Sequence, residues 1–329
     1  MKTQPTDLNG EAIANALSLH WGIDGVSLAY VPLGFGSHHW VANEPYGRKW
    51  FVTVDALEAD PAGRTDTESY DNLSNAFRTS EALRDRAGLT WVIGPTPTRT
   101  GDPIVRLTNR FTLAVFAYLD VEPTEFGEFC NLADRDEAMR LIGAVHNATS
   151  SVPLDALRRD TLNIPKRAGL HEALSTLDLD WDSGPYAARS QAYLRENDDL
   201  VLRKLERFDR LVRLATDDPR NWVVTHGEPH AGNVIRTRTG DLVVVDRDTV
   251  AYAPRERDLW MMVNDANPDW SAYRDITGVS SLSQAALEAY RLHWDLMEIA
   301  IYVSWLRQRH GQTEEMKIAW SSLQQYVKS

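Results

Sequence analysis

The sequence predicts an α+β fold of two unlike lobes, and three observations lead to this prediction. Up to about residue 117, short apolar runs separated by turn residues indicate a small antiparallel sheet. From about residue 134 the apolar residues recur mostly at helical spacing. The 329 residues, 43% of them hydrophobic, suffice for two lobes with their own cores. We therefore predict an N-terminal lobe over 1–117 and a C-terminal lobe over 118–329, with a cleft where they meet.

The N-terminal lobe is expected to open with a helix. Asn9 is its predicted N-cap, apolar residues follow at helical spacing, and Gly22 ends it. Strands are predicted over 26–31, 39–42, 49–54, 91–98 and 110–119, with a helix over about 68–86. Together these elements predict a sheet whose first strands are joined by the glycine loop GFGSHH (34–39).

The C-terminal lobe is expected to be mostly helical, with helices over about 135–150, 185–215 and 287–308. The last of these has a predicted buried stripe: Leu287, Tyr290, Trp294, Met297, Ile301 and Trp305. Asp295 and Glu298 lie three residues apart beside this stripe. They either face the cleft or belong to a solvated acidic face.

Composition and charge exclude several classes of function. The chain has 35 Lys and Arg against 47 Asp and Glu, a formal net charge of −12, which argues against nucleic acid or an anionic membrane as partner. The same charge favours a cationic ligand, although it also serves solubility alone. One cysteine permits no disulfide framework, and no stretch resembles a signal peptide or a membrane span. We expect a cytoplasmic protein, either a monomer or a homodimer.

The densest group of polar residues is THGEPHAGN (225–233). His226 and His230 have the spacing of zinc ligands on a helix, but Pro229 between them costs a helix about 3 kcal/mol. The H-x-E pattern of zinc deaminases requires a downstream P-C-x-x-C, which a chain with one cysteine lacks. The remaining interpretation is a loop that follows the strand NWVV and presents Glu228 and Asn233 to a cleft.

A hairpin is predicted directly after this loop. NVIRT and LVVVD flank RTGD, and a turn centred on Thr239 and Gly240 places Asn233 opposite Asp246. Directly opposed residues have Cα atoms about 4.5–5.5 Å apart, so an amide and a carboxylate would converge. Such oxygen ligands are what Mg²⁺ takes in nucleotide sites. Spacing alone leaves open the alternative that Asn233 caps the hairpin and Asp246 pairs with an arginine.

These residues resemble a known family. The run H-G-acid-x-H-x-G-N, a hairpin, and then apolar residues that end in Asp is similar to the aminoglycoside phosphotransferase family, which has the protein-kinase fold. HAGNV, DRDTVAYAPRERDLW and the opening HWGID look most like its spectinomycin phosphotransferase branch. The resemblance spans nearly the whole chain, with its most specific part at 226–248.

The resemblance implies roles for the loop and the hairpin. Glu228 would take the place of the catalytic aspartate that accepts the proton of the substrate hydroxyl, and His226 would orient the loop. Asn233 and Asp246 would hold Mg²⁺. Phosphoryl transfer depends largely on such positioning and charge neutralisation.

The resemblance also implies a nucleotide site for ATP or GTP. The glycine loop, with Gly34, Gly36, Ser37 and His38, would cover the phosphates. The hinge that offers backbone groups to the base would be Ala117, Tyr118 and Leu119. Asp248, Asp295 and Glu298 are the predicted contacts of a small cationic acceptor.

Two features depart from the family pattern. The catalytic aspartate is replaced by Glu228, which is one methylene longer, and a displacement of about 1 Å can cost about 100-fold in rate. Thr53 stands where kinases carry a strand lysine that grips the phosphates, so His38, His39 or an arginine would have to supply that charge.

The expected function is therefore an ATP-dependent O-phosphotransferase. It would act on a hydroxyl of an aminoglycoside or aminocyclitol antibiotic, with spectinomycin as first guess, and would confer resistance. The alternatives are a kinase of another small amino-alcohol or sugar, and a pseudo-kinase that binds its ligand without turnover.

Overall fold

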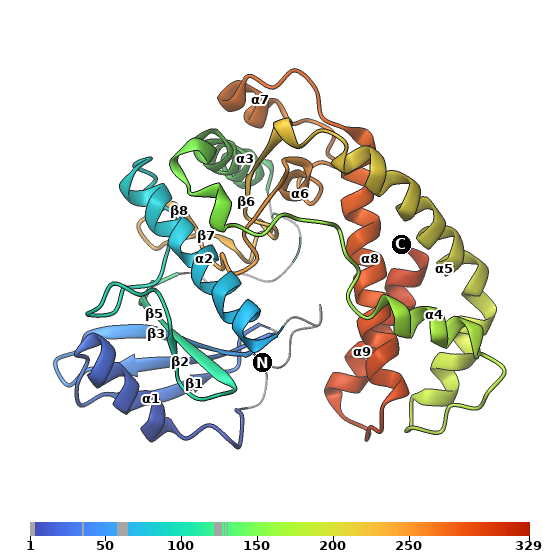
Figure 1. Cartoon of the computed structure of the whole chain (residues 1–329), viewed down its shortest axis with the longest axis horizontal. Coiled ribbons are helices and arrows are strands. Elements are labelled where there is room, and N and C mark those ends of the chain that lie inside the picture. The colour runs from blue at the N-terminus through green and yellow to red at the C-terminus, as the bar shows by residue number, and fades with distance from the viewer. Residues whose placement is uncertain (1–3, 35, 58–64, 122–126, 128, 130) are drawn as a thin grey trace. The chain divides into compact units, whose positions relative to one another are not determined.

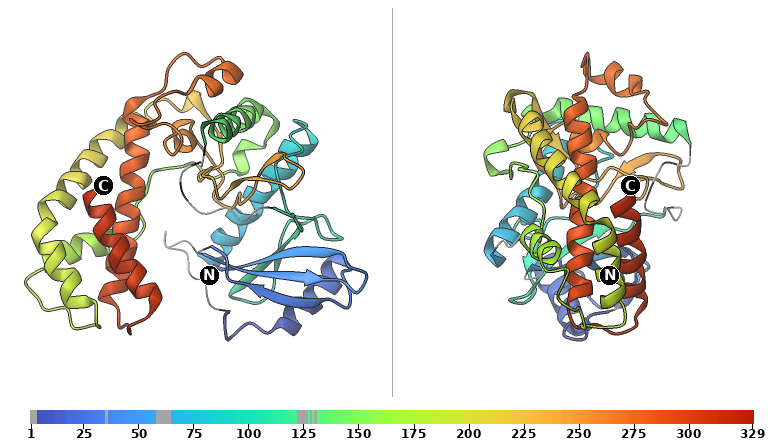
Figure 2. Two further views of the ribbon diagram at one scale, coloured as in Figure 1. Left: turned by 180° about the vertical axis from the view of Figure 1, so that it is seen from behind. Right: turned by 90° about the vertical axis from the view of Figure 1, so that its right-hand side faces the viewer.

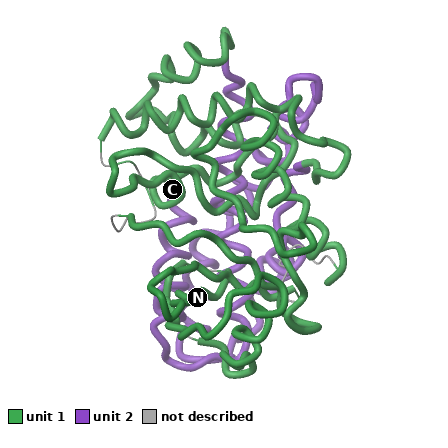
Figure 3. The backbone as a smooth tube through the Cα atoms, turned by 90° about the vertical axis from the view of Figure 1, so that its left-hand side faces the viewer, with its two compact units in different colours: residues 1–60, 64–159, 223–280 green, residues 61–63, 160–222, 281–329 purple. Residues whose placement is uncertain are grey.

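A computed structural model describes residues 4–34, 36–57, 65–121, 127, 129 and 131–329. The chain divides into two compact units, coloured separately in Figure 3. Unit 1 comprises residues 1–60, 64–159 and 223–280, and unit 2 comprises 61–63, 160–222 and 281–329. Unit 1 thus contains the predicted N-terminal lobe together with the 225–248 segment. The predicted division of function at residue 117 stays a prediction.

Unit 1 contains an antiparallel sheet of five strands in the order β1-β2-β3-β5-β4 (Figure 1). The strands are β1 (Ser27–Val31), β2 (Ser37–Asn43), β3 (Lys49–Ala56), β4 (Val105–Arg106) and β5 (Phe111–Ala117). In the register, Thr53 of β3 lies opposite His39 of β2 and Ala114 of β5. The glycine loop joins β1 to β2, and β3 ends beside the start of β2.

The two faces of this sheet are covered by different helices. Trp40, Val52, Val54 and Leu113 pack against α1 (Gly10–Ala16) and the π-turn η1 (Leu17–Trp21). On the other face, Ala114 and Phe116 pack against α2 (Asp66–Asp85) through Phe77, Tyr70 and Leu73, and Figure 2 shows α2 beside the sheet. Because side chains alternate along a strand, Phe51, Thr53 and Asp55 lie on the α2 face.

Local signals in the N-terminal segment act as predicted, with one exception. The Asn9 side chain accepts from the Glu11 N–H, and Gly22 ends the opening helix with a left-handed φ of 71°. The prediction of a strand at 91–98 is wrong, because within this segment only Val92 forms a β-bridge, which is parallel and joins it to Val244. Pro95 and Pro97 each lack the N–H that a strand pairing requires.

The rest of unit 1 consists of helices and short strands. The helices are α3 (Leu132–Asn147), α6 (Glu256–Leu259) and α7 (Ser271–Thr277), and α3 continues into the 3₁₀ turn η3 (Ala148–Ser151); η4 (Leu154–Ala156) is a second such turn. β6 (Trp222–Thr225) pairs with β9 (Ala251–Pro254), and β7 (Val234–Arg236) pairs with β8 (Leu242–Val244). The segment 226–233 therefore lies between two small strand pairs, as a loop.

Unit 2 is helical. Its elements are α4 (Arg167–Ser175), α5 (Ala187–Thr216), the 3₁₀ turn η5 (Pro219–Asn221), α8 (Gln284–Arg307) and α9 (Glu314–Lys328). Helix α8 packs against both α5 and α9, whose ribbons lie beside it in Figures 1 and 2. No helix in the described ranges combines the length and apolar character needed to cross a membrane.

The predicted buried stripe of α8 is correct only at its start. Leu287 and Tyr290 are buried, but Trp294, Met297 and Ile301 are only half-buried and Trp305 is exposed. The buried positions farther along are Leu296, Ile299, Ala300, Val303 and Leu306. A helix that packs against partners on two sides buries a wider arc than a single stripe. Periodicity alone does not show which residues lie at the centre of that arc.

Candidate active site

The loop 226–233 follows β6 directly, and its first residue is a buried histidine. His226 is fully buried, and its Nε2–H donates to the backbone oxygen of Val245 at 2.7 Å. Its Nδ1 accepts from the Glu228 N–H at 3.3 Å. Burial lowers the pKa of His226 to about 3, so the ring is neutral at pH 7. His226 thereby connects the loop to the residue that precedes Asp246.

The carboxylate of Asp258, in α6, binds the backbone of the same loop. It accepts from the backbone N–H groups of His226 (2.7 Å) and Gly227 (2.6 Å), and from Nε2–H of His146 (3.0 Å). Burial alone would raise the pKa of Asp258, but the hydrogen bond and charge of His146 bring it below its usual value. Local sequence patterns do not reveal this role of Asp258, because the groups that it binds lie 31, 32 and 112 residues away in the chain.

Gly227 is needed at its position for two reasons. Its φ of 109° is one that residues with a side chain rarely adopt. A Cβ there would lie 2.5 Å from Oγ1 of Thr249 and 2.6 Å from Nη2 of Arg257. The loop is therefore held between Asp258, Thr249 and Arg257.

The predicted hairpin is present, but its register is shifted by one residue. Val234 lies opposite Val244 and Arg236 opposite Leu242, and the Val245 N–H donates to the Asn233 oxygen at 2.9 Å. Asn233 is therefore opposite Val245, and the predicted pairing with Asp246 is wrong. Gly240, with φ of 96°, donates to Thr237, which makes the turn one residue longer than predicted. A two-residue turn would need positive φ at Thr239, which a β-branched residue resists.

Asn233 is nevertheless paired with the residue before Asp246, and the backbone at Asp246 departs from a regular ladder. Strand β8 ends at Val244, and Asp246 has a left-handed φ of 57°, which breaks the alternation of side chains. The Asn233 side chain is buried, and its amide nitrogen donates to the backbone oxygen of Glu228 at 3.0 Å. This hydrogen bond fixes the Asn233 side chain to the backbone of the loop that carries Glu228.

Several carboxylates come together at this point of unit 1. The Asp246 side chain is exposed to solvent. Enough protein nevertheless surrounds its carboxylate that desolvation raises its pKa well above the usual value. The charges of Asp248, Glu228 and Asp55 raise it further. An exposed carboxylate whose charge is disfavoured by neighbouring negative charges is suited to binding a cation. No three His, Cys, Asp or Glu side chains of the described ranges form a metal site by themselves.

Comparisons with known proteins agree with this arrangement. The model of the phosphotransferase enzyme family matches residues 109–296, which is more than half of the chain. The chain belongs to this family. It is an enzyme, a phosphotransferase whose acceptor is an alcohol group of a small molecule. No curated protein sequence matches the chain.

Solved structures show that the phosphotransferase has the kinase-like α+β fold. A spectinomycin phosphotransferase in complex with ADP and spectinomycin has a TM-score of 0.75 and 18% identity, with 98% of each chain covered. A microcompartment-associated aminopropanol kinase has a TM-score of 0.63 and 16% identity, covering 96% of this chain and 95% of its own. An amicoumacin kinase in complex with AMP-PNP, Ca²⁺ and its antibiotic has a TM-score of 0.61 and 12% identity, covering 98% and 94%.

The predicted glycine loop of the phosphotransferase has backbone conformations suited to glycine. Gly34 and Gly36 have φ values of 64° and 93°, while Phe35 lies outside the described residues. The hydroxyl of Ser37 donates to Asp55 across the β2–β3 pair. In the predicted hinge, Ala117 ends β5, Tyr118 is exposed and Leu119 is half-buried. These roles stay predictions.

The structure corrects the prediction for His38. His38 lies opposite Val54, on the face that α1 covers, and its Nδ1 contacts the Tyr30 hydroxyl at 3.2 Å. It therefore faces away from the side that carries Thr53. His39 does lie on that side, stacked on Phe51, but burial lowers its pKa to about 4, so it is neutral at pH 7. Neither ring supplies the charge of the lysine.

Asp55 is a residue near the candidate site that the sequence prediction did not include. It follows Thr53 by two positions, so strand alternation already places both on the α2 face of β3. Its Oδ1 accepts from Ser37, and its Oδ2 is a buried atom without a hydrogen-bond partner in the described chain. Burial raises its pKa to about 7, with a further contribution from the charge of Asp248. An acid stands near the position expected for a cation.

We expect Asp55→Asn to stabilise the protein clearly more at pH 8 than at pH 5. In the unfolded chain Asp55 loses its proton near pH 3.8, whereas the folded protein keeps it up to about pH 7. Stability is therefore lost as pH rises through this window, and the neutral amide removes that loss. Thermal unfolding at both pH values tests this, with a rise in Tm of about 2 °C or more expected at pH 8. An equal rise at pH 5 would show that the effect is not due to titration.

The two predicted acceptor contacts on α8 have partners within unit 2. Asp295 accepts from Nζ of Lys204 at 2.7 Å and from the Ser329 hydroxyl at 2.8 Å, so it joins α5, α8 and α9. We therefore replace its predicted role in acceptor binding with a structural one. Glu298 is half-buried, and desolvation raises its pKa although Tyr302 donates a hydrogen bond to it. Glu298 stays a predicted acceptor contact.

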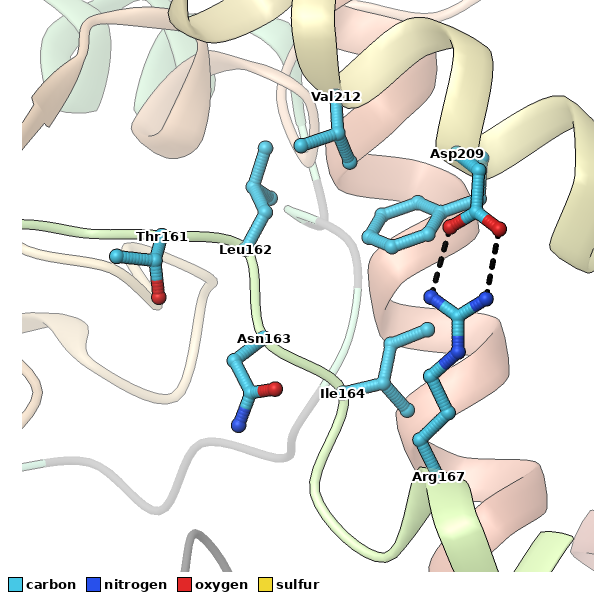
Figure 4. A pocket seen from close by; sticks show the side chains of 8 residues that line it. Thr161, Leu162, Asn163, Ile164, Arg167, Asp209 and Val212 are labelled. Carbon is cyan, nitrogen blue, oxygen red and sulfur yellow. Dashed lines mark hydrogen bonds and ion pairs between the residues drawn. The ribbon is translucent and has the colours of Figure 1, made fainter. Parts of the chain in front are cut away.

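Two cavities do not involve any predicted site residue. One, of about 370 Å³, lies in unit 2 between the segment 161–164 and α5. Figure 4 shows its rim, where Arg167 donates two hydrogen bonds of 2.7 Å to Asp209. The other, of about 180 Å³, lies in unit 1 beside Arg135 and Met262. The candidate site is thus defined by its side chains rather than by either cavity.

Proposed function

We propose that the protein transfers the γ-phosphoryl group of ATP, or of GTP, to a hydroxyl of an aminocyclitol or aminoglycoside antibiotic, with spectinomycin as the first candidate. Such a reaction would confer resistance. The observation that carries the proposal is the loop 226–233, which places Glu228 close enough to Asp246 for its charge to contribute, after burial and Asp248, to the raised pKa of that carboxylate. Glu228, on a loop that His226 and Asp258 hold in place, is thus close to the candidate metal ligand Asp246.

In the proposed reaction, Glu228 accepts the proton of the acceptor hydroxyl. The oxygen of that hydroxyl bonds to the γ-phosphorus, the bond from this phosphorus to the β-phosphate oxygen breaks, and ADP leaves. Glu228 is half-buried, so it can reach a substrate, and its backbone oxygen and N–H are both held within the loop. His226 contacts no substrate and acts by positioning the loop.

The residues fit a magnesium ion. The Asn233 amide oxygen and the Asp246 carboxylate would hold it, and the crowded negative charge around Asp246 is what a divalent cation offsets. When bound, Mg²⁺ would neutralise charge on the phosphates. Gly34, Gly36 and Ser37 would cover the phosphates, and residues 117–119 would meet the base. In this proposal residues 1–117 bind the nucleotide and 118–329 carry catalysis and the acceptor.

The acceptor is proposed from charge and from similar proteins. A net charge of −12 favours a cationic acceptor, and Asp248 and Glu298 are its proposed contacts. Asp248 lies beside Asp246, and desolvation raises its pKa, so an amino group nearby would relieve the cost of its charge. The spectinomycin phosphotransferase was crystallised with nucleotide and antibiotic, which makes this class of acceptor the first to test.

The deciding experiment is an ADP-release assay with the full chain, ATP and Mg²⁺. The acceptors should include spectinomycin, other aminoglycosides, macrolides and small amino-alcohols such as aminopropanol. We expect turnover with an aminocyclitol above the rate without acceptor. Turnover with aminopropanol alone would instead support the second candidate, a small amino-alcohol kinase, which the fold of the aminopropanol kinase favours. Nucleotide binding without turnover of any acceptor would indicate a pseudo-kinase. Glu228 and Asp55 are the reasons to consider this alternative.

We expect Glu228→Gln to lower kcat by about 10²–10⁴-fold while it leaves ATP affinity nearly unchanged, because the amide cannot accept the proton. Glu228→Asp should also lower kcat, since the shorter acid stands about 1 Å too far from the hydroxyl. Steady-state kinetics and ATP titration provide both numbers. A faster Glu228→Asp variant would show that the site is not shaped for glutamate, and weaker ATP binding with intact kcat would assign Glu228 to the nucleotide site.

A further inference from the structure

Arg247, which follows Asp246 directly, has an unusual environment. Its side chain is 1% exposed, and its Nε, Nη1 and Nη2 are all buried atoms without a hydrogen-bond partner in the described chain. A guanidinium has five N–H donors, and burial of a charged group without hydrogen bonds is costly. A buried guanidinium without hydrogen bonds indicates that this side chain has a second conformation in which it makes them.

Arg135 shows how a buried arginine is normally accommodated in this protein. It is 6% exposed and donates to the backbone oxygens of Asn267 at 3.3 Å and Asp269 at 3.0 Å. It also forms an ion pair of 3.0 Å with Asp136. Both arginines belong to unit 1, so Arg135 is a matched control for Arg247.

Among the described residues, the carboxylate that acts on the charge of Arg247 is that of Asp258, and its oxygens already accept other hydrogen bonds. Asp258 raises the pKa of Arg247, whereas burial lowers it, to about 10, so the guanidinium stays charged at neutral pH. The oxygens of Asp258 accept from two backbone N–H groups and from His146. The guanidinium of Arg247 is therefore a buried positive charge near the candidate catalytic loop, and it makes no hydrogen bond within the described chain.

Among the described residues on the α2 face of β2 and β3, the one cation is Lys49, and it lies far from the end of the sheet where Thr53 and Asp55 are. His39 is neutral at pH 7, and Thr53 and Asp55 follow along β3. Lys49 lies at the opposite end of that strand, with its Nζ 5.3 Å from the centre of the Tyr118 ring. Triphosphate transfer requires cationic groups at the phosphates.

The backbone next to Arg247 is also in an unfavourable conformation. Asp246 has a left-handed φ of 57°, which a residue with a side chain adopts at a cost. Consecutive Cα atoms are about 3.8 Å apart, so the guanidinium needs only a local rearrangement to reach the space around Asp246. Backbone strain and the buried charge both favour a second arrangement of residues 246–248.

We propose that Arg247 is the phosphate-binding cation of this enzyme, and that it exchanges between the buried position and one in which its guanidinium donates to the nucleotide phosphates. It would thereby do what a strand lysine does in protein kinases. Guanidinium suits this task, because it is always charged and binds phosphate oxygens in bidentate fashion. The inference rests on the proposed function.

The test compares Arg247→Met and Arg247→Lys with the unchanged protein, in the full chain with Mg²⁺. Thermal unfolding without nucleotide measures the cost of the buried charge, and calorimetric titration measures affinity for ATP and for adenosine, which has no phosphate. We expect Arg247→Met to raise Tm by about 2–4 °C, because an apolar side chain fits the buried position better. ATP affinity should fall roughly 10- to 100-fold, with adenosine affinity unchanged and Arg247→Lys intermediate.

The control variant Arg135→Met should lower Tm, because it leaves backbone oxygens without donors, and should leave the ratio of ATP to adenosine affinity unchanged. The inference is overturned if Arg247→Met also lowers Tm or fails to fold, or if it binds ATP as tightly as the unchanged protein. The proposed function itself fails if the unchanged protein binds neither ATP nor adenosine, a result that no Arg247 variant is needed to reveal.

Discussion

Asp246→Asn is expected to abolish most phosphoryl transfer while it makes the protein more stable. The activity should fall about 10²–10³-fold, because the proposed metal site loses its carboxylate and each factor of ten corresponds to about 1.4 kcal/mol. Stability should rise at neutral pH, because desolvation and the charges of Asp248, Glu228 and Asp55 all disfavour the Asp246 carboxylate.

Asparagine is the appropriate replacement at this position. Asp246 has a φ of 57°, and asparagine tolerates the left-handed region better than other residues with side chains. The variant therefore changes the charge without a new backbone strain, which alanine would not ensure. Activity measured over a range of Mg²⁺ concentrations, together with thermal unfolding, separates the loss of a metal ligand from a loss of fold.

Asp241→Asn serves as the control for Asp246→Asn, because Asp241 lies in the turn of the same hairpin and is exposed. It should change neither activity nor Tm measurably. If Asp246→Asn retains full activity at every Mg²⁺ concentration, Asp246 does not hold the metal. If it destabilises the protein, the crowding of carboxylates inferred around it is not real.

Asp258→Asn is expected to have the largest effect on stability, a loss of about 3–5 kcal/mol. The carboxylate is fully buried and accepts from two backbone N–H groups and one imidazole. An amide has only one accepting oxygen, so at least one of these buried donors loses its partner. The catalytic loop should then lose its fixed shape, and activity should fall with it.

Urea unfolding measures this loss, with Asp209→Asn as the comparison. Asp209 also accepts two hydrogen bonds, from Arg167, but its side chain is 50% exposed, so its replacement should cost about 1 kcal/mol or less. Equal losses in the two variants would contradict the view that Asp258 organises the loop. Asp258→Asn with normal stability but no activity would instead place Asp258 in direct contact with substrate.

The sequence also shows how far local signals reach. The α1 cap at Asn9, the end of that helix at Gly22 and the loop after β6 were predicted because each depends on residues next to one another. The hairpin register was wrong by one residue because turn length is decided by the backbone preferences of Thr239 and Gly240, which the pairing of apolar residues does not reveal.

The sequence by itself determined the α+β class and the family, and it singled out the loop 226–233 as the centre of the candidate site, since these follow from periodicity and from one compact motif. Only the tertiary structure decided which face of β2 His38 occupies, that Asp295 is paired with Lys204, and that Asp258 and Arg247 lie beneath the loop. The physical reason is that burial, pKa and hydrogen bonding depend on groups tens of residues apart, whose distances only the packing of the folded chain establishes.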